Sequence, residues 1–473
     1  MNYPTKMGKN FQTLNKKKMK IKLFQNFSPA SKEAWLEQAK KDLKGADFEQ
    51  QLVTQSAEGF PIYPYYSSED TVESQWVKAY DNRLNPPSDI PEASARHWVN
   101  AVEVTGVDES SINLEIKQVL DHGAEGIILS PSGTQEWDVV FDGIILPYIS
   151  VWLKPEGDVR HILEGFSSWL KRQGKDKTAM RGGILWDPLH VGFEKPIEMA
   201  QQFELAKRIF HWFADYPHFK SLCLDGTVYH NAGATAVQEI GYGLAALVEL
   251  WDGLTERGID AQSLFSDLHI LTAVGSDYFM EIAKLKTLRI AVQQLAALYQ
   301  AAILPEDLPL FAMTSTWSKS EQEPHNNLLR NTTEAMAAII GGCQAILVNP
   351  HNPYSSDAFS KRMARNISTI LKEEAYFDKS LDPAAGSYYV ESLIHTLYQE
   401  SFALLKKIET EGGWAKLYLQ RQIQREVKAV RNQRLLRLTQ ERIFPNEAVS
   451  NSLFEEEYQL KACSHFSMIN PSA

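Results

Sequence analysis

Between residues 98 and 349, short apolar runs rich in β-branched residues alternate with longer stretches of helical periodicity. This alternation constrains the fold most strongly, because strands that are apolar on both faces and separated by helices form parallel sheets. Eight runs are typical of strands, at residues 99–104, 126–130, 149–154, 182–187, 221–225, 269–274, 308–314 and 343–349. Helices are predicted between them, most clearly over residues 158–171, 196–213, 232–251 and 278–299. Eight such units over about 250 residues match an α/β fold, the (β/α)8 TIM barrel.

A doubly wound open sheet is the alternative arrangement for the same alternation. Such sheets commonly carry a glycine-rich phosphate loop after the first strand. Neither G-x-G-x-x-G nor G-x-x-x-x-G-K-[ST] occurs in the sequence. The barrel is therefore the preferred prediction.

The segments that flank the predicted barrel differ from it in composition. Residues 1–27 are rich in lysine and are predicted to be a disordered basic leader. Residues 28–90 are expected to form an N-terminal helix from Ser28-Pro29 and then an extended, partner-wrapping arm around "EGFPIYPYYSSED". The barrel is assigned to residues 91–391, and residues 392–473 are assigned to a C-terminal helical region that is broken at Gly412-Gly413 and packs on the barrel or on another chain.

Charge and cysteine content exclude several classes of protein. The formal net charge of −11 argues against a nucleic-acid or anionic-membrane binder, which needs an excess of Lys and Arg. No apolar run approaches the ~20 residues of a membrane span. Three unclustered cysteines, Cys223, Cys343 and Cys463, fit a reducing compartment and offer no zinc or disulfide framework. We therefore expect a cytoplasmic protein.

A (β/α)8 barrel places its chemistry at the C-terminal ends of its strands. Asp187 and Asp225 end two predicted strands and could act as an acid–base pair, although capping of the following turn is the favoured interpretation. His230 lies between a strand end and an Ala-rich helix, a common position for a general acid. Thr235 and Glu239 lie four residues apart on that helix and are interpreted as a solvated or interhelical pair.

The histidines do not form a recognisable metal motif. H-E-x-x-H is absent, and we interpret His211 and His218, which lie among aromatic residues, as partly buried packing groups. Asp267-Leu268-His269 matches the beginning of a D-x-H-x-x-G cobalt-ligand loop, but Thr272 occupies the glycine position. We therefore predict no metal-binding residue.

Two long blocks carry a specific resemblance. The first is "TSTWSKSEQEPHNNLLRNTTEAMAAIIGGCQAILVNPHN", and the second is "RMARNISTILKEEAYFDKSLDPAAGSYYVESL". Together with "AGATAVQEIGYGLA" and the early "WLEQAKKDLKGADFEQ", they make residues 30–420 resemble the methylmalonyl-CoA mutase family. The resemblance implies a (β/α)8 barrel. In catalytic members it also implies a cobalamin domain, radical chemistry started by adenosylcobalamin, and a CoA pantetheine chain threaded along the barrel axis.

The sequence departs from the catalytic members at the positions that matter most. Catalytic members read Gly-Tyr-His-Met-Gln-Glu-Ala-Gly-Ala where this chain reads "GTVYHNAGA", so their tyrosine falls on Thr227 and their catalytic histidine on Val228. Their polar Arg-x-His-x-Gln stretch meets Pro309, Phe311 and Met313, and we expect Phe311 and Met313 to fill the barrel axis. Their R-Q-Y-A-G string is missing near Trp98, and we expect no cobalamin-binding domain.

These departures resemble the non-catalytic small subunits of the family. The resemblance implies a heterodimer with a large subunit that binds adenosylcobalamin and interconverts succinyl-CoA and methylmalonyl-CoA. We then expect no catalytic or cofactor-binding residue on this chain, and a structural role for His230. Two alternatives stay open. One is an acyl-CoA mutase chain that works with a separate cobalamin-binding subunit, with His230 replacing the missing histidine, and the other is a homodimer that binds acyl-CoA without turnover.

Overall fold

The computed structural model describes residues 31–80, 83–85, 87, 94–133, 135–174, 176–190, 195–320, 323–352 and 357–440. The predicted basic leader, Ser28-Pro29 and Cys463 lie outside the described residues. Within the described part of the chain, every helix is either too short or too polar to cross a membrane.

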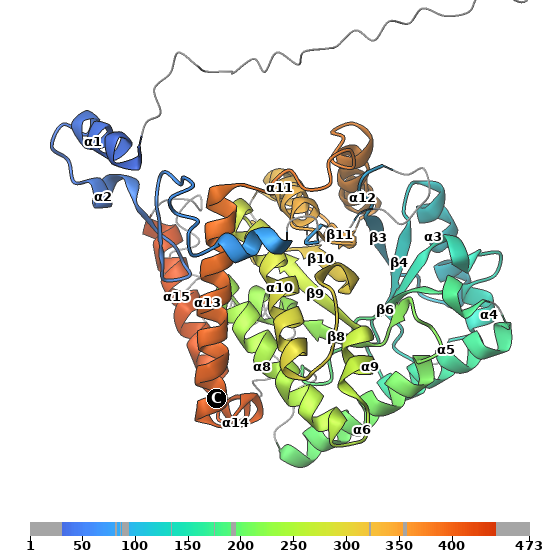
Figure 1. Cartoon of the computed structure of the whole chain (residues 1–473). Coiled ribbons are helices and arrows are strands. Elements are labelled where there is room, and N and C mark those ends of the chain that lie inside the picture. Colours follow the sequence, from blue (N-terminus) through green and yellow to red (C-terminus); the bar gives the residue numbers. More distant parts are fainter. Residues whose placement is uncertain are drawn as a thin grey trace, which may run out of the picture. The chain divides into compact units, whose positions relative to one another are not determined.

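Parallel strands close into a barrel that is surrounded by helices (Figure 1). The sheet order is β7-β6-β5-β4-β3-β11-β10-β9-β8, so its two ends, β7 and β8, are neighbours in sequence. The eight predicted strands are confirmed, with ends that differ by a few residues. The barrel strands are β3 (Val99–Val104), β4 (Gly126–Leu129), β5 (Ser150–Leu153), β6 (Arg181–Ile184), β7 (Phe219–Lys220), β8 (Leu222–Asp225), β9 (Leu268–Val274), β10 (Leu310–Thr314) and β11 (Ala345–Leu347).

Ser221 separates β7 from β8, and β8 corresponds to the fifth predicted strand, residues 221–225. Its backbone N–H donates to the Asp267 carboxylate at 3.2 Å, and its hydroxyl donates to the same carboxylate. On the N-terminal side of Ser221, Phe219 and Lys220 pair with β6. On its C-terminal side, β8 pairs with β9. The two pieces therefore serve as one barrel strand, which gives the eightfold ring.

Helices follow the strands and form the outer layer. Several of them begin at residues that cap them: for example, Asp158 accepts a hydrogen bond from the His161 N–H, and Asp357 accepts one from the Ser360 N–H. The helices are α3 (Glu109–Asp121), α4 (Trp137–Val140), α5 (Val159–Gln173), α6 (Pro196–Phe213), α7 (Thr227–Asn231), α8 (Ala236–Thr255), α9 (Ala261–Ser266), α10 (Tyr278–Leu298), α11 (Asn327–Ile340) and α12 (Ala358–Glu373).

The helix after β8 begins later than the sequence predicts. We expected it to start at residue 232, but Gly233 has a φ of +94° and separates the short α7 from α8. Thr235 then caps α8 and accepts a hydrogen bond from the Gln238 N–H at 3.2 Å. His230 therefore lies in α7.

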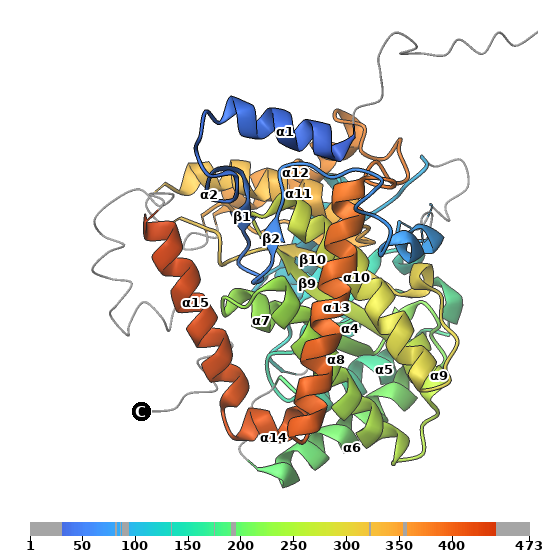
Figure 2. The ribbon, with the colours of Figure 1, turned by 60° about the vertical axis from the view of Figure 1, so that its left-hand side comes forward.

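Three C-terminal helices follow the barrel: α13 (Tyr388–Glu411), α14 (Trp414–Leu419) and α15 (Gln422–Gln440). The predicted break is confirmed, because Gly412 and Gly413 both have positive φ, +111° and +88°. Helix α13 packs against α8 and α10, and the chain then turns back through α14 into α15 (Figure 2). The tail therefore covers part of the outer ring, as the sequence predicts.

The described part of the N-terminal segment, residues 31–54, forms a compact unit of its own. Helix α1 (Lys32–Asp42) is capped by Ser31, not by Ser28 as predicted, because the Ser31 side chain accepts a hydrogen bond from the Ala34 N–H. Helix α2 (Phe48–Leu52) follows, and the rings of Trp35 and Phe48 pack 6.4 Å apart. The remaining elements before the barrel are β1 (Thr54–Gln55), β2 (Pro61–Ile62) and the 3-10 helix η1 (Gln75–Tyr80).

Candidate functional site

The barrel axis is filled by side chains that point inward from every strand of the ring. Trp152 of β5 and Phe311 of β10 come from opposite sides, since three strands separate β5 from β10 in either direction. Their ring centroids are 4.8 Å apart at an interplanar angle of 77°, an edge-to-face contact across the axis. The buried interior cluster consists of Ala101, Ile128, Trp152, Leu185, Cys223, Leu271, Phe311, Ala345 and Leu347, with Val99 and Met313 packed against it.

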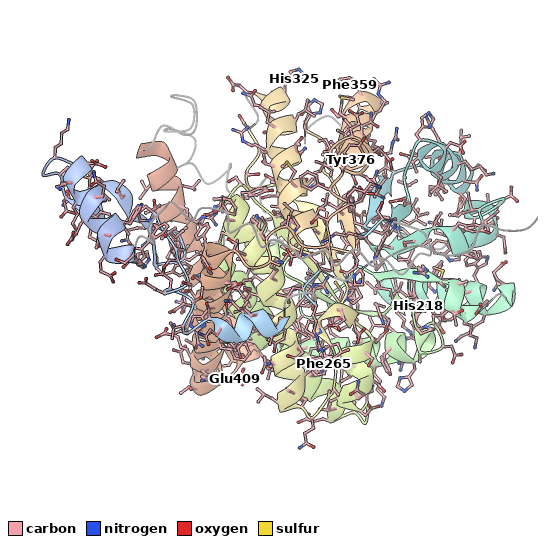
Figure 3. The ribbon with its side chains drawn as sticks, turned by 45° about the horizontal axis from the view of Figure 1, so that its top comes forward. His218, Phe265, His325, Phe359, Tyr376 and Glu409 are labelled. Carbon is pink, nitrogen blue, oxygen red and sulfur yellow. The ribbon has the colours of Figure 1, made fainter. Side chains whose placement is uncertain are left out.

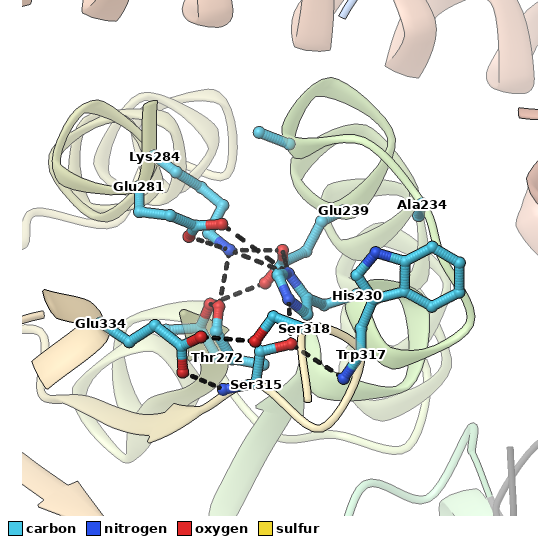
Figure 4. Close-up of polar contacts among 12 residues, drawn as sticks. His230, Ala234, Glu239, Thr272, Glu281, Lys284, Ser315, Trp317, Ser318 and Glu334 are labelled. Atoms are coloured by element: carbon cyan, nitrogen blue, oxygen red, sulfur yellow. Dashed lines mark hydrogen bonds and ion pairs between the residues drawn. The ribbon is translucent and has the colours of Figure 1, made fainter. Parts of the chain in front are cut away.

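A buried polar network lies just beyond the C-terminal ends of β9 and β10 (Figure 4). His230 connects two sides of it: its Nε2 is 2.9 Å from the Ser315 Oγ, and its Nδ1 is 3.4 Å from the Glu239 Oε2. Ser315 directly follows β10, whereas Glu239 belongs to the first turns of α8. The network therefore joins the strand ends to the helices around them.

Glu239 and Lys284 form the centre of this network. The Lys284 Nζ lies 2.7 Å from carboxylate oxygens of both Glu239 and Glu281, and it donates to the Ala273 carbonyl at 2.6 Å. Thr272 donates to the other oxygen of Glu239, also at 2.6 Å. Burial opposes the charge on both partners, but the Lys284 ammonium lowers the pKa of Glu239, and the two carboxylates raise the pKa of Lys284. The ion pair therefore stays charged.

Glu334 of α11 holds the loop after β10 in place. It accepts hydrogen bonds from the Ser315 N–H at 3.1 Å and from the Lys319 Nζ and the Ser318 hydroxyl, each at 2.5 Å. Burial raises the pKa of Glu334 and lowers the pKa of Lys319. This second ion pair closes the network on the side of α11.

Ser315, His230 and Glu239 follow the order of a nucleophile, a base and an orienting carboxylate. However, Ser315 has 0% of its surface exposed, and its Oγ also accepts a hydrogen bond from the Trp317 N–H at 3.0 Å. Glu239 is bonded to Lys284 and Thr272 in addition to its contact with His230. In this arrangement the three residues connect structural elements, and the predicted structural role of His230 fits these contacts.

The buried ion pairs of Lys284 with Glu239 and Glu281 were not predicted from the sequence. Glu239 was interpreted as half of a pair with Thr235, but it is 1% exposed, and Thr235 instead caps α8. A signal was present in α10, where Glu281 and Lys284 lie three residues apart among the apolar residues of its first two turns. A buried helix face with two opposite charges at this spacing indicates a buried ion pair.

Asp187 and Asp225 cap turns, as the favoured interpretation predicts. Asp187 accepts hydrogen bonds from the N–H groups of Leu189 at 2.9 Å and Asp225 at 3.1 Å. Asp225 accepts from the Thr227 N–H at 2.8 Å. Asp187 also lies 3.0 Å from the Nδ1 of His190. Burial by itself lowers the pKa of this imidazole, but the Asp187 carboxylate raises it above its usual value.

The positions that the resemblance assigns to family active-site residues lie in structural contacts here. Val228, which the resemblance places at the catalytic histidine, lies in α7 and belongs to the outer hydrophobic core. The Thr227 hydroxyl donates to Asp225. Trp98 is buried before β3 and donates from its Nε1 to the Ser368 Oγ at 2.9 Å. The carbonyl of Pro309 accepts the Ile270 N–H of the neighbouring strand at 2.9 Å.

The structure brings no set of three metal-binding side chains together within its described residues. The interpretation of His211 and His218 as partly buried groups is wrong, because both are exposed at the end of α6 and before β7 (Figure 3 labels His218). His269 is 2% exposed within β9, and its Nε2 is 3.0 Å from the Ile184 carbonyl. It does not fit as a cobalt ligand, since a corrin ring cannot reach an imidazole inside the barrel wall.

Part of the predicted arm contacts its own barrel. The two carboxylate oxygens of Glu58 accept the N–H groups of Ala236 and Val237 at 3.0 and 2.9 Å, which caps the N-terminus of α8. Arg434 of α15 donates to the Ala234 carbonyl at 2.7 Å, and its guanidinium lies 5.6 Å from the Trp317 ring centroid. The arm and the tail therefore contact the start of α8 and the loops next to the polar network.

Comparisons with known proteins agree with this architecture. The family described as methylmalonyl-CoA mutase matches residues 112–459. The methylmalonyl-CoA mutase small subunit of Porphyromonas gingivalis is 30% identical over 430 residues, which cover 87% of this chain and 68% of the relative. The small subunit of Streptomyces virginiae is 28% identical over 414 residues, with coverage of 83% and 66%.

A large subunit is also among the relatives. The methylmalonyl-CoA mutase large subunit of Porphyromonas gingivalis is 33% identical over 305 residues, which cover 63% of this chain and 42% of the relative. The chain thus spans between 42% and 68% of the lengths of these three relatives. From the closed parallel barrel, the family match and the extent of these similarities, the chain belongs to the methylmalonyl-CoA mutase family.

Proposed function

We propose that this chain is the small subunit of a heterodimeric methylmalonyl-CoA mutase and is catalytically inert by itself. It supports a large subunit that binds adenosylcobalamin, and the complex interconverts succinyl-CoA and methylmalonyl-CoA in the cytoplasm. The proposal includes the domain division predicted from the sequence, in which residues 28–90 form a partner-wrapping arm.

The edge-to-face contact of Trp152 with Phe311 carries the proposal. The resemblance to catalytic members implies a pantetheine chain along the barrel axis, and such a chain needs an open path. Here two buried aromatic rings meet on that axis, with centroids 4.8 Å apart. A barrel packed in this way is the ordinary stable state of the fold and offers stability to a partner instead of a substrate path.

The C-terminal face gives independent support. Val228 has no polar atom in its side chain and cannot donate a hydrogen bond to a thioester carbonyl. His230, the residue nearest in sequence that could replace it, is 5% exposed and is bonded to Ser315 and Glu239. His269 does not fit as a cobalt ligand, so no step of the reaction is assigned to this chain.

The relatives give the expected partner. Porphyromonas gingivalis has both a small and a large methylmalonyl-CoA mutase subunit similar to this chain. An obligate pair of this kind buries more than about 2,000 Å². We assign the contact to the arm and to exposed parts of the helical tail.

Co-expression tests the proposal. A tagged copy of this chain is expressed with the untagged large subunit of the same organism, and the tagged protein is purified. Its molar mass is then measured by size-exclusion chromatography with light scattering. We expect a complex with one copy of each chain. A tagged chain that elutes alone, as a monomer or homodimer, with the large subunit left in the unbound fraction would overturn the proposal.

A further inference from the structure

A cavity of about 280 Å³ lies at the N-terminal end of the barrel, away from the polar network. The residues that line it come from the segment before β3, the end of α11 and the loop after α12. None of them belongs to the interior cluster on the barrel axis. Phe359, at the start of α12, and Tyr376, beyond its end, are labelled in Figure 3. The lining residues are Arg96, Ile339, Ile340, Ala375, Tyr376, Phe377, Ser380, Leu381 and Pro383.

The walls of this cavity are mainly apolar, and one wall carries a cation. Arg96 is 3% exposed, and among the described residues its guanidinium donates to two neutral groups, the Asn85 Oδ1 and, at 2.8 Å, the Cys343 carbonyl. Its Nε has no hydrogen-bond partner among the described residues. Burial lowers the pKa of Arg96, and the nearby Cys343 and Asp382 oppose this shift only in part. An anion bound beside the guanidinium would offset more of the desolvation of this buried charge.

The described acidic residues near Arg96 form their ion pairs with lysines. Asp382 forms a buried ion pair with Lys286. Asp378 lies 2.9 Å from the Lys379 Nζ. A second buried guanidinium, Arg289, donates to backbone carbonyls of Pro305, Leu308 and Gly342 and adds positive charge close by. Burial, together with the charge on Arg96, lowers the pKa of Arg289 to about 9.

We propose that this cavity binds a small organic monocarboxylate, whose carboxylate pairs with Arg96 and whose apolar body lies against Ile339, Phe377 and Leu381. A cavity of ~150 Å³ holds one benzene molecule, so a space of about 280 Å³ accommodates an aliphatic acid of about ten heavy atoms. One guanidinium in the lining matches a single negative charge. The rim residue Tyr376 is 62% exposed with a φ of +56°, a strained backbone of the kind found at ligand sites.

Calorimetric titration of the full chain with octanoate tests this site. The site does not depend on the proposed mutase function, because the titration uses this chain without a large subunit. We expect one saturable site, with octan-1-ol binding at least about 10-fold more weakly, since a charge-assisted hydrogen bond contributes about 1.5–3 kcal/mol. Octanoate that does not bind, or octanol that binds equally well, overturns the proposal.

Three variants locate the binding. Arg96→Met removes the charge and is expected to weaken octanoate binding about 10-fold or more while it leaves octanol binding unchanged. Ala375→Trp fills the exposed side of the cavity without removing a hydrogen bond, so it is expected to abolish binding even if Arg96→Met does not fold. Arg160→Met removes an exposed arginine on α5 and is the matched control, which should bind as the wild type does. Binding by Ala375→Trp equal to that of Arg160→Met overturns the assignment of the site.

Discussion

Replacing Phe311 by alanine removes one of the two rings that meet on the barrel axis. Phe311 is 2% exposed, and its partner Trp152 is 6% exposed, so no solvent replaces the lost contact. Truncation of a buried phenylalanine costs about 3–5 kcal/mol of the free energy of unfolding. The edge-to-face pair itself accounts for about 0.5–1.5 kcal/mol of this loss.

Urea unfolding, followed by circular dichroism and tryptophan fluorescence, measures both quantities. The single variants Phe311→Ala and Trp152→Ala and the double variant form a thermodynamic cycle, whose coupling energy should be about 0.5–1.5 kcal/mol. Phe359→Ala is the matched control, because Phe359 is 49% exposed and its loss should cost less than about 0.5 kcal/mol. A loss below about 1 kcal/mol for Phe311→Ala, or a coupling energy of zero, would refute the packed axis.

The other predictions concern stability and pH. Lys284→Met leaves Glu239 without its cation, so we expect the free energy of unfolding to fall by about 3–5 kcal/mol in urea titrations, and a fall below about 1 kcal/mol would contradict a buried ion pair. Burial lowers the pKa of His269 to about 4 from 6.5, so the native state resists a proton that the unfolded chain accepts, and stability is lost as the pH falls from about 6.5 to 4. Unfolding of His269→Gln at pH 7 and pH 4 should show a pH dependence smaller by about 3 kcal/mol, and equal dependence in both proteins would argue against this assignment. Glu58→Gln removes the negative charge at the start of α8 and should lower the free energy of unfolding by about 0.3–1 kcal/mol. This loss should be smaller when the urea titration is repeated in high salt, and an unchanged loss there would exclude a charge effect.

The barrel could be predicted from the sequence because its signal is local. Each strand is a short apolar run that a turn or helix follows, and the pattern of residues 126–130 or 269–274 needs no information from elsewhere. The split at Ser221 could not be predicted, because it depends on Asp267, a residue 46 positions away. The start of α8 was placed four residues early because the positive φ of Gly233 depends on its surroundings.

The candidate site was predicted less completely than the fold. Phe311 was assigned to the axis from the family resemblance, and its contact with Trp152 confirms that assignment. Glu239 was interpreted as part of a solvated or interhelical pair with Thr235, because the two residues lie four apart on one helix face. Its true partners, Thr272 and Lys284, come from β9 and α10, so only the folded barrel brings them together.

Turnover by each chain alone and by the complex tests the central claim most directly. This chain, the large subunit and the purified pair are each mixed with adenosylcobalamin and succinyl-CoA, and methylmalonyl-CoA is measured. A further sample combines this chain with a separate cobalamin-binding protein. The account predicts turnover by the pair, with one adenosylcobalamin bound per heterodimer, and no turnover by this chain in any mixture that lacks the large subunit. Methylmalonyl-CoA formed by this chain without the large subunit would contradict it.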